Sequence, residues 1–406
     1  MAPLDLDATV AVVGSGLAGL RAAEKLRAQG HRGPLVLLGA EHHVPYDRPP
    51  LSKQLLAGTW GLDRVVLRTK EKLEALSLDM RLGCRATALD LEGRRLELDD
   101  GGTLGFDGLV LATGAEPRAL PGTGEVAGVH LLRTLDDCAA LATATADPAT
   151  RLVVIGAGFI GSEVAATCHG RGLEVTVLEA LPVPLERALG ARMGAACAAL
   201  HGAHGVALRT GTAVSGLAVE EGGVRGVELA EGSVVPADVV LVGIGVAPAT
   251  GWLEGSGLEL RDGVVSDATL HAADGVVVAG DLARWRDEAA GTDRRIEHWT
   301  NAAEQGMHAA RSLLAGREAA EAYRPVPYFW SDQYDVKIQM LGTPSPDDDV
   351  EVVDGSVDEE RFVAVYGRAG TLTGAIAFSR PRQLMGFRPL LEGGASFEEA
   401  LALLAS

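Results

Sequence analysis

The clearest pattern in the chain is a set of short, uninterrupted apolar runs, most of which are followed directly by a glycine. They cover residues 10–13, 35–38, 109–111, 152–155, 239–242 and 276–278. Such runs are typical of strands buried on both faces of a parallel sheet. Alanine- and leucine-rich stretches with helical spacing, such as residues 20–28 and 185–202, lie between them. The pattern predicts an α/β fold in which parallel strands alternate with helices.

Two regions depart from this alternation. Residues 41–53 contain Pro45, Pro49 and Pro50, which prevent regular structure until a helix begins. Because proline is well tolerated in a first helical turn, the Pro49–Pro50 pair predicts a helix over residues 51–56. Residues 78–104 predict a strand, a turn and a hairpin.

The pattern changes again beyond Pro325 and Pro327. Aromatic residues become more frequent, and residues 362–366 and 372–378 have the composition of strands. A last helix is expected from Ser396. This part of the chain is predicted to form a separate, smaller domain.

Residues 9–19, TVAVVGSGLAG, join the first apolar run to the first helical stretch. The spacing of Gly14, Gly16 and Gly19 is that of a dinucleotide-binding turn. The first glycine allows the sharp turn, the second lets the backbone approach a pyrophosphate, and the third lets helix and strand pack closely. The helix N-terminus behind them favours an anion. A single motif of this kind is equally compatible with a tight turn that binds nothing.

The motif recurs at residues 152–163, LVVIGAGFIGSE, and this recurrence decides the interpretation. Each copy is followed by a second strand and by an acid, Glu41 or Glu179, where the fingerprint expects a carboxylate for the ribose hydroxyls. Two dinucleotides are therefore expected. The strand that ends at Asp281 follows the second motif but suits the first nucleotide, so the second domain is expected to be inserted into the first.

Composition and charge narrow the function classes. The 406 residues carry a net charge of −19 and are 47% hydrophobic, which is typical of a folded chain and argues against nucleic acid or anionic membranes as partners. The four cysteines form neither C-x-x-C nor C-x4-C, so neither a disulfide framework, a redox dithiol nor a metal site is expected. We find no signal peptide or membrane span in the sequence and expect a soluble, cytoplasmic protein.

Further motifs point to a family. YDRPPLSK (46–53), LVLATG (109–114), VAGD (278–281), EHWTNAAEQG (297–306) and YFWSDQY (328–334) occur in this order around the second glycine motif. Together they resemble the FAD-dependent NADH:ferredoxin reductases of bacterial oxygenase systems, the putidaredoxin reductase-like and dioxygenase reductase-like family. The resemblance covers nearly the whole chain.

The resemblance implies two Rossmann-like domains of the glutathione-reductase type and a C-terminal α+β interface domain. The FAD domain would comprise residues 1–115 and 246–324, the NAD domain residues 116–245, and the interface domain residues 325–406. FAD and NADH are the implied cofactors. The implied FAD-binding residues are Gly14, Gly16, Ala18, Gly19, Glu41, Arg48, Lys53, Ala86, Ala112, Thr113, Gly114, Arg133, Gly280, Asp281, Trp299 and Trp330. The implied NAD-binding residues are Gly156, Gly158, Phe159, Ile160, Gly161, Glu163, Glu179 and Gly245.

Lys53 and Glu163 are the candidate catalytic residues. The family places Lys53 near the flavin, where a cation favours the reduced, anionic ring, and Glu163 near the nicotinamide, paired with Lys53. The simpler interpretations are an exposed helix lysine and an acid that stabilises a helix N-terminus. Glu179 predicts NADH rather than NADPH, because a carboxylate repels a 2′-phosphate. Ala40 displaces Glu41 by one residue from the usual position of the acid.

The implied reaction passes electrons from NADH through FAD to a two-iron two-sulfur ferredoxin that serves a haem monooxygenase or a Rieske dioxygenase. Arg380, Arg382 and Arg388 form a basic segment expected to dock the ferredoxin, whereas the acidic residues 347–360 are expected to be a solvated rim. The alternatives are an NADH oxidase or a rubredoxin or disulfide reductase on the same fold, and a non-catalytic FAD redox sensor.

Overall fold

Contacts along the chain group into two units in the computed structural model, which describes residues 3–124, 126–288 and 290–404. Unit 1 comprises Met1–Asp47, Leu62–Glu116 and Ala247–Pro325. Unit 2 comprises Arg48–Gly61, Pro117–Val246 and Val326–Ser406. Each unit is thus assembled from segments far apart in the sequence.

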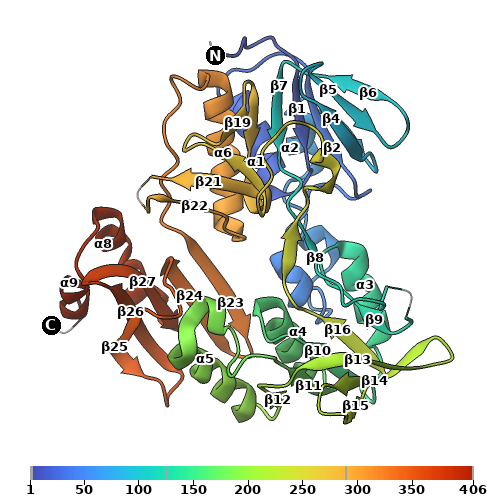
Figure 1. Ribbon diagram of the computed structural model, residues 1–406, viewed down its shortest axis with the longest axis vertical. Helices are drawn as coiled ribbons and strands as arrows, with labels where there is room; N and C mark the ends of the chain where they lie inside the picture. The colour runs from blue at the N-terminus through green and yellow to red at the C-terminus, as the bar shows by residue number, and fades with distance from the viewer. Residues whose placement is uncertain (1–2, 125, 289, 405–406) are drawn as a thin grey trace. The chain divides into compact units, whose positions relative to one another are not determined.

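A six-stranded sheet forms the centre of unit 1 (Figure 1). Five of its strands are parallel, and only the edge strand β19 runs antiparallel to its neighbour. In spatial order the strands are β19 (His271–Ala273), β20 (Val276–Val278), β7 (Gly108–Leu111), β1 (Val10–Val13), β2 (Leu35–Gly39) and β3 (Asp79–Leu82). The central strands are buried on both faces, as their uninterrupted apolar runs predict.

Two helices, α1 (Leu17–Ala28) and α6 (Trp299–Ala315), cover one face of this sheet. They approach so closely that a side chain on Gly306 would collide with the carbonyl oxygen of Ala18. The opposite face packs against an antiparallel sheet of β4 (Ala86–Asp90), β5 (Arg95–Leu98) and β6 (Thr103–Gly105). A third small sheet in the unit contains β18 (Val264–Ser266), β21 (Ala283–Asp287) and β22 (Thr292–Arg294).

Unit 2 contains a second parallel sheet, built on the second glycine motif. Its strand order is β12 (Ala207–Arg209), β11 (Glu174–Leu178), β10 (Arg151–Ile155), β16 (Val239–Val242) and β9 (Val129–His130). The helix α4 (Phe159–Gly170) follows β10, and α3 (Leu135–Ala144) begins with a capping box formed by Thr134 and Asp137. The strands β13 (Val214–Glu220), β14 (Gly223–Leu229) and β15 (Val234–Pro236) form an antiparallel sheet that packs on β10 and β16.

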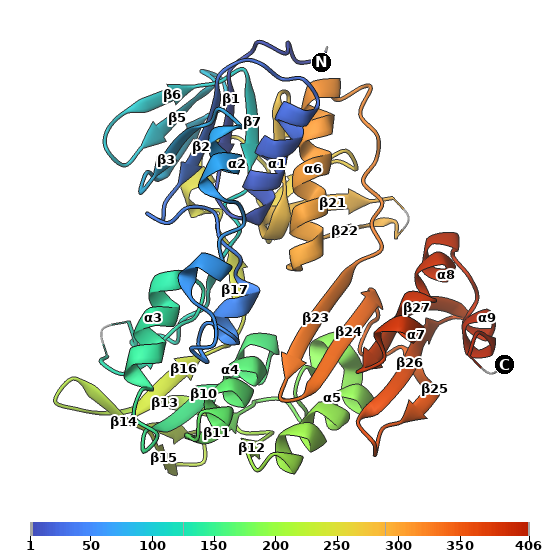
Figure 2. The same ribbon diagram turned by 180° about the vertical axis from the view of Figure 1, so that it is seen from behind.

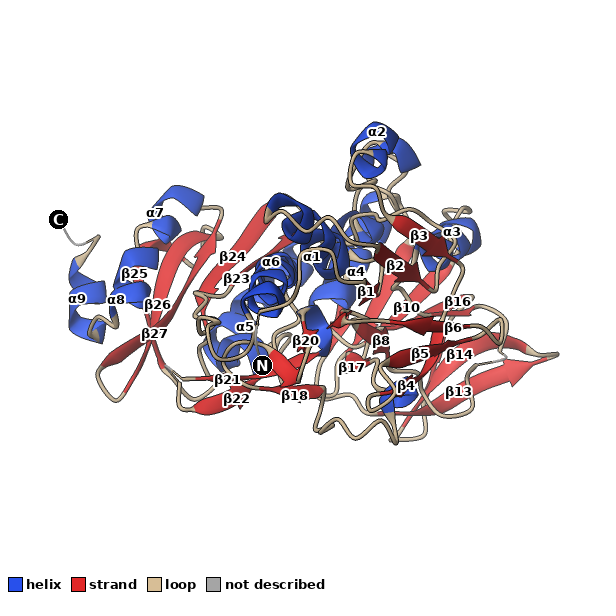
Figure 3. Ribbon diagram, turned by 90° about the horizontal axis from the view of Figure 1, so that it is seen from above, coloured by secondary structure: helices blue, strands red, loops and turns tan. Residues whose placement is uncertain are grey.

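The C-terminal part of unit 2 is a five-stranded antiparallel sheet (Figure 2). Its order is β23 (Tyr328–Gln333), β24 (Val336–Gly342), β27 (Thr371–Phe378), β26 (Arg361–Arg368) and β25 (Asp349–Ser356). One face shares a core with α5 (Glu186–Ala203), the helix after β11. The other face is covered by α7 (Pro381–Met385), α8 (Arg388–Gly393) and α9 (Phe397–Ala402), which are the blue helices near the red strands β26 and β27 in Figure 3.

One expected element is wrong. The helix expected over residues 51–56 is instead a single 3-10 turn, η1 (Pro49–Ser52), followed by turns. The carbonyl of Leu51 accepts a hydrogen bond from Cys138 Sγ at 3.3 Å, and that of Ser52 accepts one from Thr167 Oγ1 at 2.8 Å. Because the side chains of α3 and α4 hold these carbonyls, the backbone does not continue as an α-helix.

Candidate functional site

The first glycine motif forms a tight turn between β1 and α1. Gly14 has a φ of +114°, and a side chain there would collide with the carbonyl oxygen of Ala112. A side chain on Gly19 would collide with the carbonyl oxygen of Gly14. At Gly16, by contrast, no described atom lies within 4 Å of where a Cβ would stand. The middle glycine therefore faces open space at the N-terminus of α1.

The second motif repeats this geometry between β10 and α4. Gly156 has a φ of +98°, and side chains on Gly156 and Gly161 would meet the carbonyl oxygens of Gly243 and Gly156. Beside Gly158, the nearest described atom to a Cβ is the carbonyl oxygen of Gly243, at 3.9 Å. Two apolar side chains near this turn, Ile160 and Ile244, are 44% and 38% exposed.

Both turns fit a pyrophosphate. The helices α1 and α4 begin at glycine N-caps that supply no side-chain hydrogen bond to the first amides. These amides and the helix dipole attract an anion, and each middle glycine leaves room for it. Each unit thus contains a backbone turn that matches one of the two pyrophosphate-binding motifs inferred from the sequence.

The two acids are placed differently. The Glu179 carboxylate follows β11 and accepts hydrogen bonds from the amides of Ala157 and Leu181, at 2.7 and 2.8 Å. Strand register aligns Leu38 with Val13 and Leu178 with Ile155, so Gly39 in unit 1 stands where Glu179 stands in unit 2. Glu41 lies two residues beyond that position and accepts a hydrogen bond from Tyr46 Oη at 2.6 Å.

The other candidate FAD residues of unit 1 gather at the carboxyl ends of the strands, the usual ligand edge of a parallel sheet. Ala112, Thr113 and Gly114 follow β7, and Thr113 Oγ1 donates to the carbonyl of Ala249 at 3.1 Å. Gly280 and Asp281 follow β20 in a short 3-10 turn, η4 (Gly280–Leu282).

Three further candidate FAD residues of unit 1, Ala18, Trp299 and Ala86, lie on other elements. Ala18 lies in the first turn of α1, where its Cβ would be 3.0 Å from a Cβ on Gly280. Trp299 is the first residue of α6, and its indole Nε1 donates to Asp47 Oδ1 at 2.6 Å. Ala86 is buried at the start of β4. Trp299 therefore links Asp47 to the start of α6 within unit 1.

In unit 2, the structure brings the two candidate catalytic residues together. Lys53 Nζ lies 2.8 Å from Glu163 Oε2, and the two residues are only 9% and 3% exposed. Two hydroxyls also donate to the carboxylate, Ser52 Oγ to Oε2 at 2.5 Å and Ser331 Oγ to Oε1 at 2.8 Å. A buried ion pair is tolerated only when its remaining hydrogen-bonding capacity is satisfied, and these serines supply that.

The remaining candidates of unit 2 are Arg48, Arg133, Trp330, Phe159 and Gly245. Arg48 Nη1 donates to the carbonyl of Arg133 at 2.5 Å, which ties the start of the PPLSK segment to the chain before α3. Trp330 precedes Ser331 on β23 and stacks on Tyr328 with ring centroids 6.1 Å apart. Phe159, the first residue of α4, contacts Phe329 edge-on at 4.6 Å. Gly245 adopts a φ of +97° in the turn after β16.

Two of the three arginines in the basic segment lie near an acidic side chain. Arg380 lies 3.5 Å from Asp354, and Arg388 lies 3.6 Å from Glu392 in the same helix. Arg382 is exposed in α7, and no acid of the described residues lies within salt-bridge distance of it. The exposed Met385 is in the same short helix.

Several residues of these sites were missed by sequence reasoning. Ser52 and Ser331 lie inside quoted motifs, next to Lys53 and Trp330, but nothing in the sequence joins them to Glu163. Arg295 and Gln305 contact the Gly280–Asp281 turn. Gln305 lies inside the quoted motif 297–306 and Arg295 just before it, but nothing in the sequence joins either residue to this turn.

Groups that titrate or bind metals add little at these sites. All four cysteines are free, and burial raises the pKa of Cys138 and Cys168 to about 11 and that of Cys197 to about 12. Burial lowers the pKa of His298 to about 4, so this histidine is neutral near pH 7. Among the described residues there is no cluster of side chains suited to a metal ion. No helix in the described ranges could cross a bilayer.

An α/β chain with two pyrophosphate-binding turns is an oxidoreductase of the class that uses two dinucleotides. The chain matches the pyridine nucleotide-disulphide oxidoreductase family over residues 8–306 and a reductase C-terminal domain over residues 328–403. It belongs to this family, so the family resemblance and the fold class predicted from the sequence are confirmed. Membership implies FAD and NAD(H), as predicted.

Known relatives match along almost the whole chain. Rhodocoxin reductase of Rhodococcus erythropolis is 38% identical over 386 residues, which are 94% of this chain and 89% of that protein. The ferredoxin–NAD(+) reductase component of the anthranilate 1,2-dioxygenase system of Burkholderia cepacia is 38% identical over 95% of this chain and 94% of its own. The crystal structure of the covalent putidaredoxin reductase–putidaredoxin complex superposes with a TM-score of 0.92 and 32% identity, covering 98% of this chain and 96% of that one.

Proposed function

We propose that this protein is an NADH-dependent, FAD-containing ferredoxin reductase that supplies electrons to an oxygenase system. The two pyrophosphate-binding turns carry the proposal, because they provide for an electron donor and a flavin in one chain. The names of the relatives, which are reductases that act with ferredoxins, support the same function. We further propose that the electron acceptor is a two-iron two-sulfur ferredoxin, which serves a haem monooxygenase or a Rieske dioxygenase. The proposed location is the cytoplasm.

We assign FAD to the turn at Gly14–Gly19 in unit 1 and NADH to the turn at Gly156–Gly161 in unit 2. The assignment rests on the acids: Glu179 is already held at the second turn, where it would accept from both hydroxyls of an NADH ribose. The first turn has Gly39 in that register. The division into an FAD domain (1–115 and 246–324), an NAD domain (116–245) and an interface domain (325–406) is part of this proposal.

When bound, FAD supplies a group that accepts a hydride and returns electrons one at a time. The residues of this chain provide binding and position. The amides of α1 and α4 hold the pyrophosphates, while Ile160 and Ile244 cover the second turn with apolar surface. Glu163 keeps Lys53 in one position as a charged pair, and the serines fix the carboxylate. We propose that Lys53 and Glu163 are the catalytic residues, with Lys53 acting on the flavin and Glu163 on the nicotinamide.

The test is anaerobic reduction of the purified protein by NADH, followed by mixing with candidate ferredoxins. We expect the flavin absorbance to bleach with NADH and to return when an oxidised ferredoxin is added. Bleaching that ends only with oxygen or with a small disulfide would favour an oxidase or a disulfide reductase, and rubredoxin reduction alone would favour a rubredoxin reductase. Slow bleaching with every acceptor and a long-lived charge-transfer band would favour a redox sensor. Any of these three results would contradict the proposal.

We further propose that Arg380, Arg382 and Arg388 contribute to ferredoxin docking. Arg382 is the strongest candidate, because the other two already have acidic neighbours. Arg382→Glu is expected to slow ferredoxin reduction about tenfold at low salt while NADH reduction of the flavin is unchanged. Reversal of Arg225, an exposed arginine on β14, is the control. Equal rates for the triple reversal and the wild type would rule out this docking site.

A further inference from the structure

The turn that carries Asp281 is held by two side chains outside the motif. It follows β20 and begins with Gly280, whose φ of +77° is left-handed. The amide of Gly280 donates to the side-chain oxygen of Gln305 at 2.9 Å, and the carbonyl of Asp281 accepts from Arg295 Nη1 at 3.2 Å. The main chain is therefore fixed on both sides of the Asp281 side chain.

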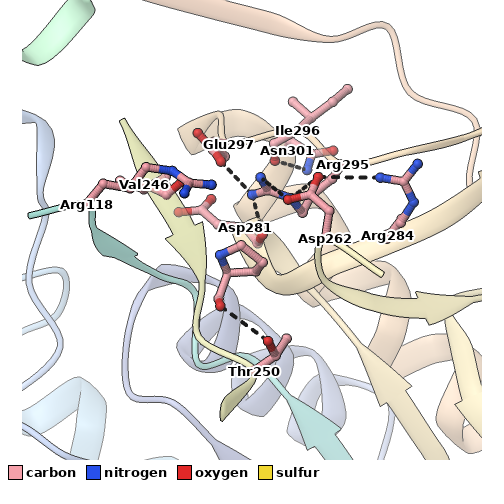
Figure 4. Close-up of polar contacts among 11 residues, drawn as sticks. Arg118, Val246, Thr250, Asp262, Asp281, Arg284, Arg295, Ile296, Glu297 and Asn301 are labelled. Carbon is pink, nitrogen blue, oxygen red and sulfur yellow. Dashed lines mark hydrogen bonds and ion pairs between the residues drawn. The ribbon is translucent and has the colours of Figure 1, made fainter. Parts of the chain in front are cut away.

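Arg295 is itself rigidly held, as Figure 4 shows. Its Nε and Nη2 donate to the two carboxylate oxygens of Asp262 at 3.2 and 3.1 Å, and its Nη1 donates to Glu297 Oε1 at 2.5 Å. Its side chain is only 11% exposed. Burial works against its charge, but the hydrogen bonds that it donates to Asp262 and Glu297, and their negative charges, outweigh burial and raise the pKa of Arg295. The guanidinium is thus a permanent cation with one orientation.

Gln305 holds the other side of the turn from α6. It is 0% exposed, and its oxygen faces the amide of Gly280. The neighbouring Gly306 packs so closely on Ala18 that a Cβ on it would lie 2.2 Å from the Ala18 carbonyl oxygen, so α6 and α1 are in close contact. Gln305 thus ties the Gly280–Asp281 turn to α6, which packs directly on α1 behind the first glycine motif.

We propose that Arg295 and Gln305 are positioning residues of the FAD site: they lock the Gly280–Asp281 turn so that the Asp281 carboxylate is presented to the cofactor. The proposal rests on the assignment of FAD to unit 1. A carboxylate on a short turn has many orientations, and each one lost before binding lowers the entropy cost of holding the ligand. Neither residue touches the reacting atoms in this role.

The test measures FAD release from the holoenzyme on dilution, followed by flavin fluorescence, in a double-mutant cycle. We expect Arg295→Gln and Gln305→Leu each to weaken FAD retention about tenfold, as the loss of one hydrogen bond that positions the turn predicts. In an Asp281→Ala background, the same changes should have little effect, because the side chain they orient is gone. The matched control is Arg284→Gln, since Arg284 contacts Asp262 at 3.4 Å without contacting Asp281.

The outcomes separate this inference from the proposed function. Equal losses of FAD with and without the Asp281 side chain would mean that Arg295 and Gln305 act only on general stability, and would overturn the inference. Unchanged FAD retention in both single variants would overturn it as well. A wild-type protein that binds no FAD would instead overturn the proposed function. The visible circular dichroism of the bound flavin gives a second readout, which should change in Arg295→Gln and not in Arg284→Gln.

Discussion

The two glycine turns of this protein have almost the same backbone and differ in one neighbouring position. In each turn, the first glycine is left-handed, the third packs on the carbonyl of the first, and the middle one faces open space. The strand beside the second turn, β11, is followed by Glu179, whose carboxylate accepts a hydrogen bond from the amide of Ala157 within the turn. In the first turn, that register position is Gly39, and a side chain on it would collide with Ser15 Oγ.

The glycines and the acid have different roles in recognising a dinucleotide. The glycines create a pyrophosphate site and are indifferent to the rest of the dinucleotide. In dinucleotide-binding folds, an acid at the end of the second strand hydrogen-bonds the ribose, and of the two turns only the second has an acid at this position. In the first turn, Ser15 Oγ lies where a Cβ on Gly39 would stand, and Glu41 is the acid closest in sequence to this position.

The largest effects are expected from filling the open space beside the middle glycines. A methyl group at Gly16 or Gly158 collides with no protein atom, and both residues have φ values near −75°, which alanine adopts without strain. Gly16→Ala should abolish FAD retention, and Gly158→Ala should spare FAD but weaken NADH binding. Loss of two hydrogen bonds to phosphate oxygens costs about 4 kcal/mol, roughly 1,000-fold in affinity. Flavin content and NADH titration measure the two effects.

Gly170→Ala is the control for these variants. Gly170 is the last residue of α4, and no described atom is within 4 Å of a Cβ there. Thermal unfolding of the cofactor-free proteins should be the same for all three variants. Gly16→Ala protein with a full complement of FAD would contradict the assignment, and loss of FAD from Gly158→Ala alone would reverse it.

Unit 2 contains a buried histidine on α5, the helix after Glu179. His201 is fully buried, and its Nδ1 is 2.7 Å from Tyr334 Oη. Burial lowers its pKa from 6.5 to about 4, so the folded protein binds fewer protons than the unfolded chain between these pH values. Stability therefore falls as the pH drops through this window, by about 3 kcal/mol in total.

His201→Gln keeps an acceptor for Tyr334 and removes the titration. Urea unfolding at a series of pH values should show a flatter profile for this variant than for the wild type between pH 6.5 and 4. His204→Gln is the control, because His204 stacks on the same tyrosine at 3.9 Å but is partly exposed. An unchanged slope in His201→Gln would show that other groups carry the acid sensitivity.

The parts of the molecule that could be predicted from sequence are those determined locally. The apolar runs identify the central strands of both sheets, and the glycine spacing identifies both turns, because each depends on residues close together in the chain. The group around Glu163 could not be derived in this way, since Ser52 and Ser331 are 111 and 168 residues from it. The η1 turn was missed for the same reason: contacts from α3 and α4 override the local preference of the Pro49–Pro50 pair.

The smallest effect, and the sharpest test of the difference between the turns, concerns the acids themselves. Glu179→Gln removes a charge at the second turn, so NADH affinity should fall about tenfold and the preference over NADPH should narrow. Glu41→Gln should leave nicotinamide binding alone and weaken FAD retention only a few-fold, since Glu41 is already bonded to Tyr46 and lies outside the strand register. Steady-state kcat/KM with NADH and NADPH, beside flavin content, distinguishes the two. If the wild type used NADPH better than NADH, or if Glu41→Gln changed the nicotinamide preference as much as Glu179→Gln, the acid at the strand end would not be what distinguishes the two sites.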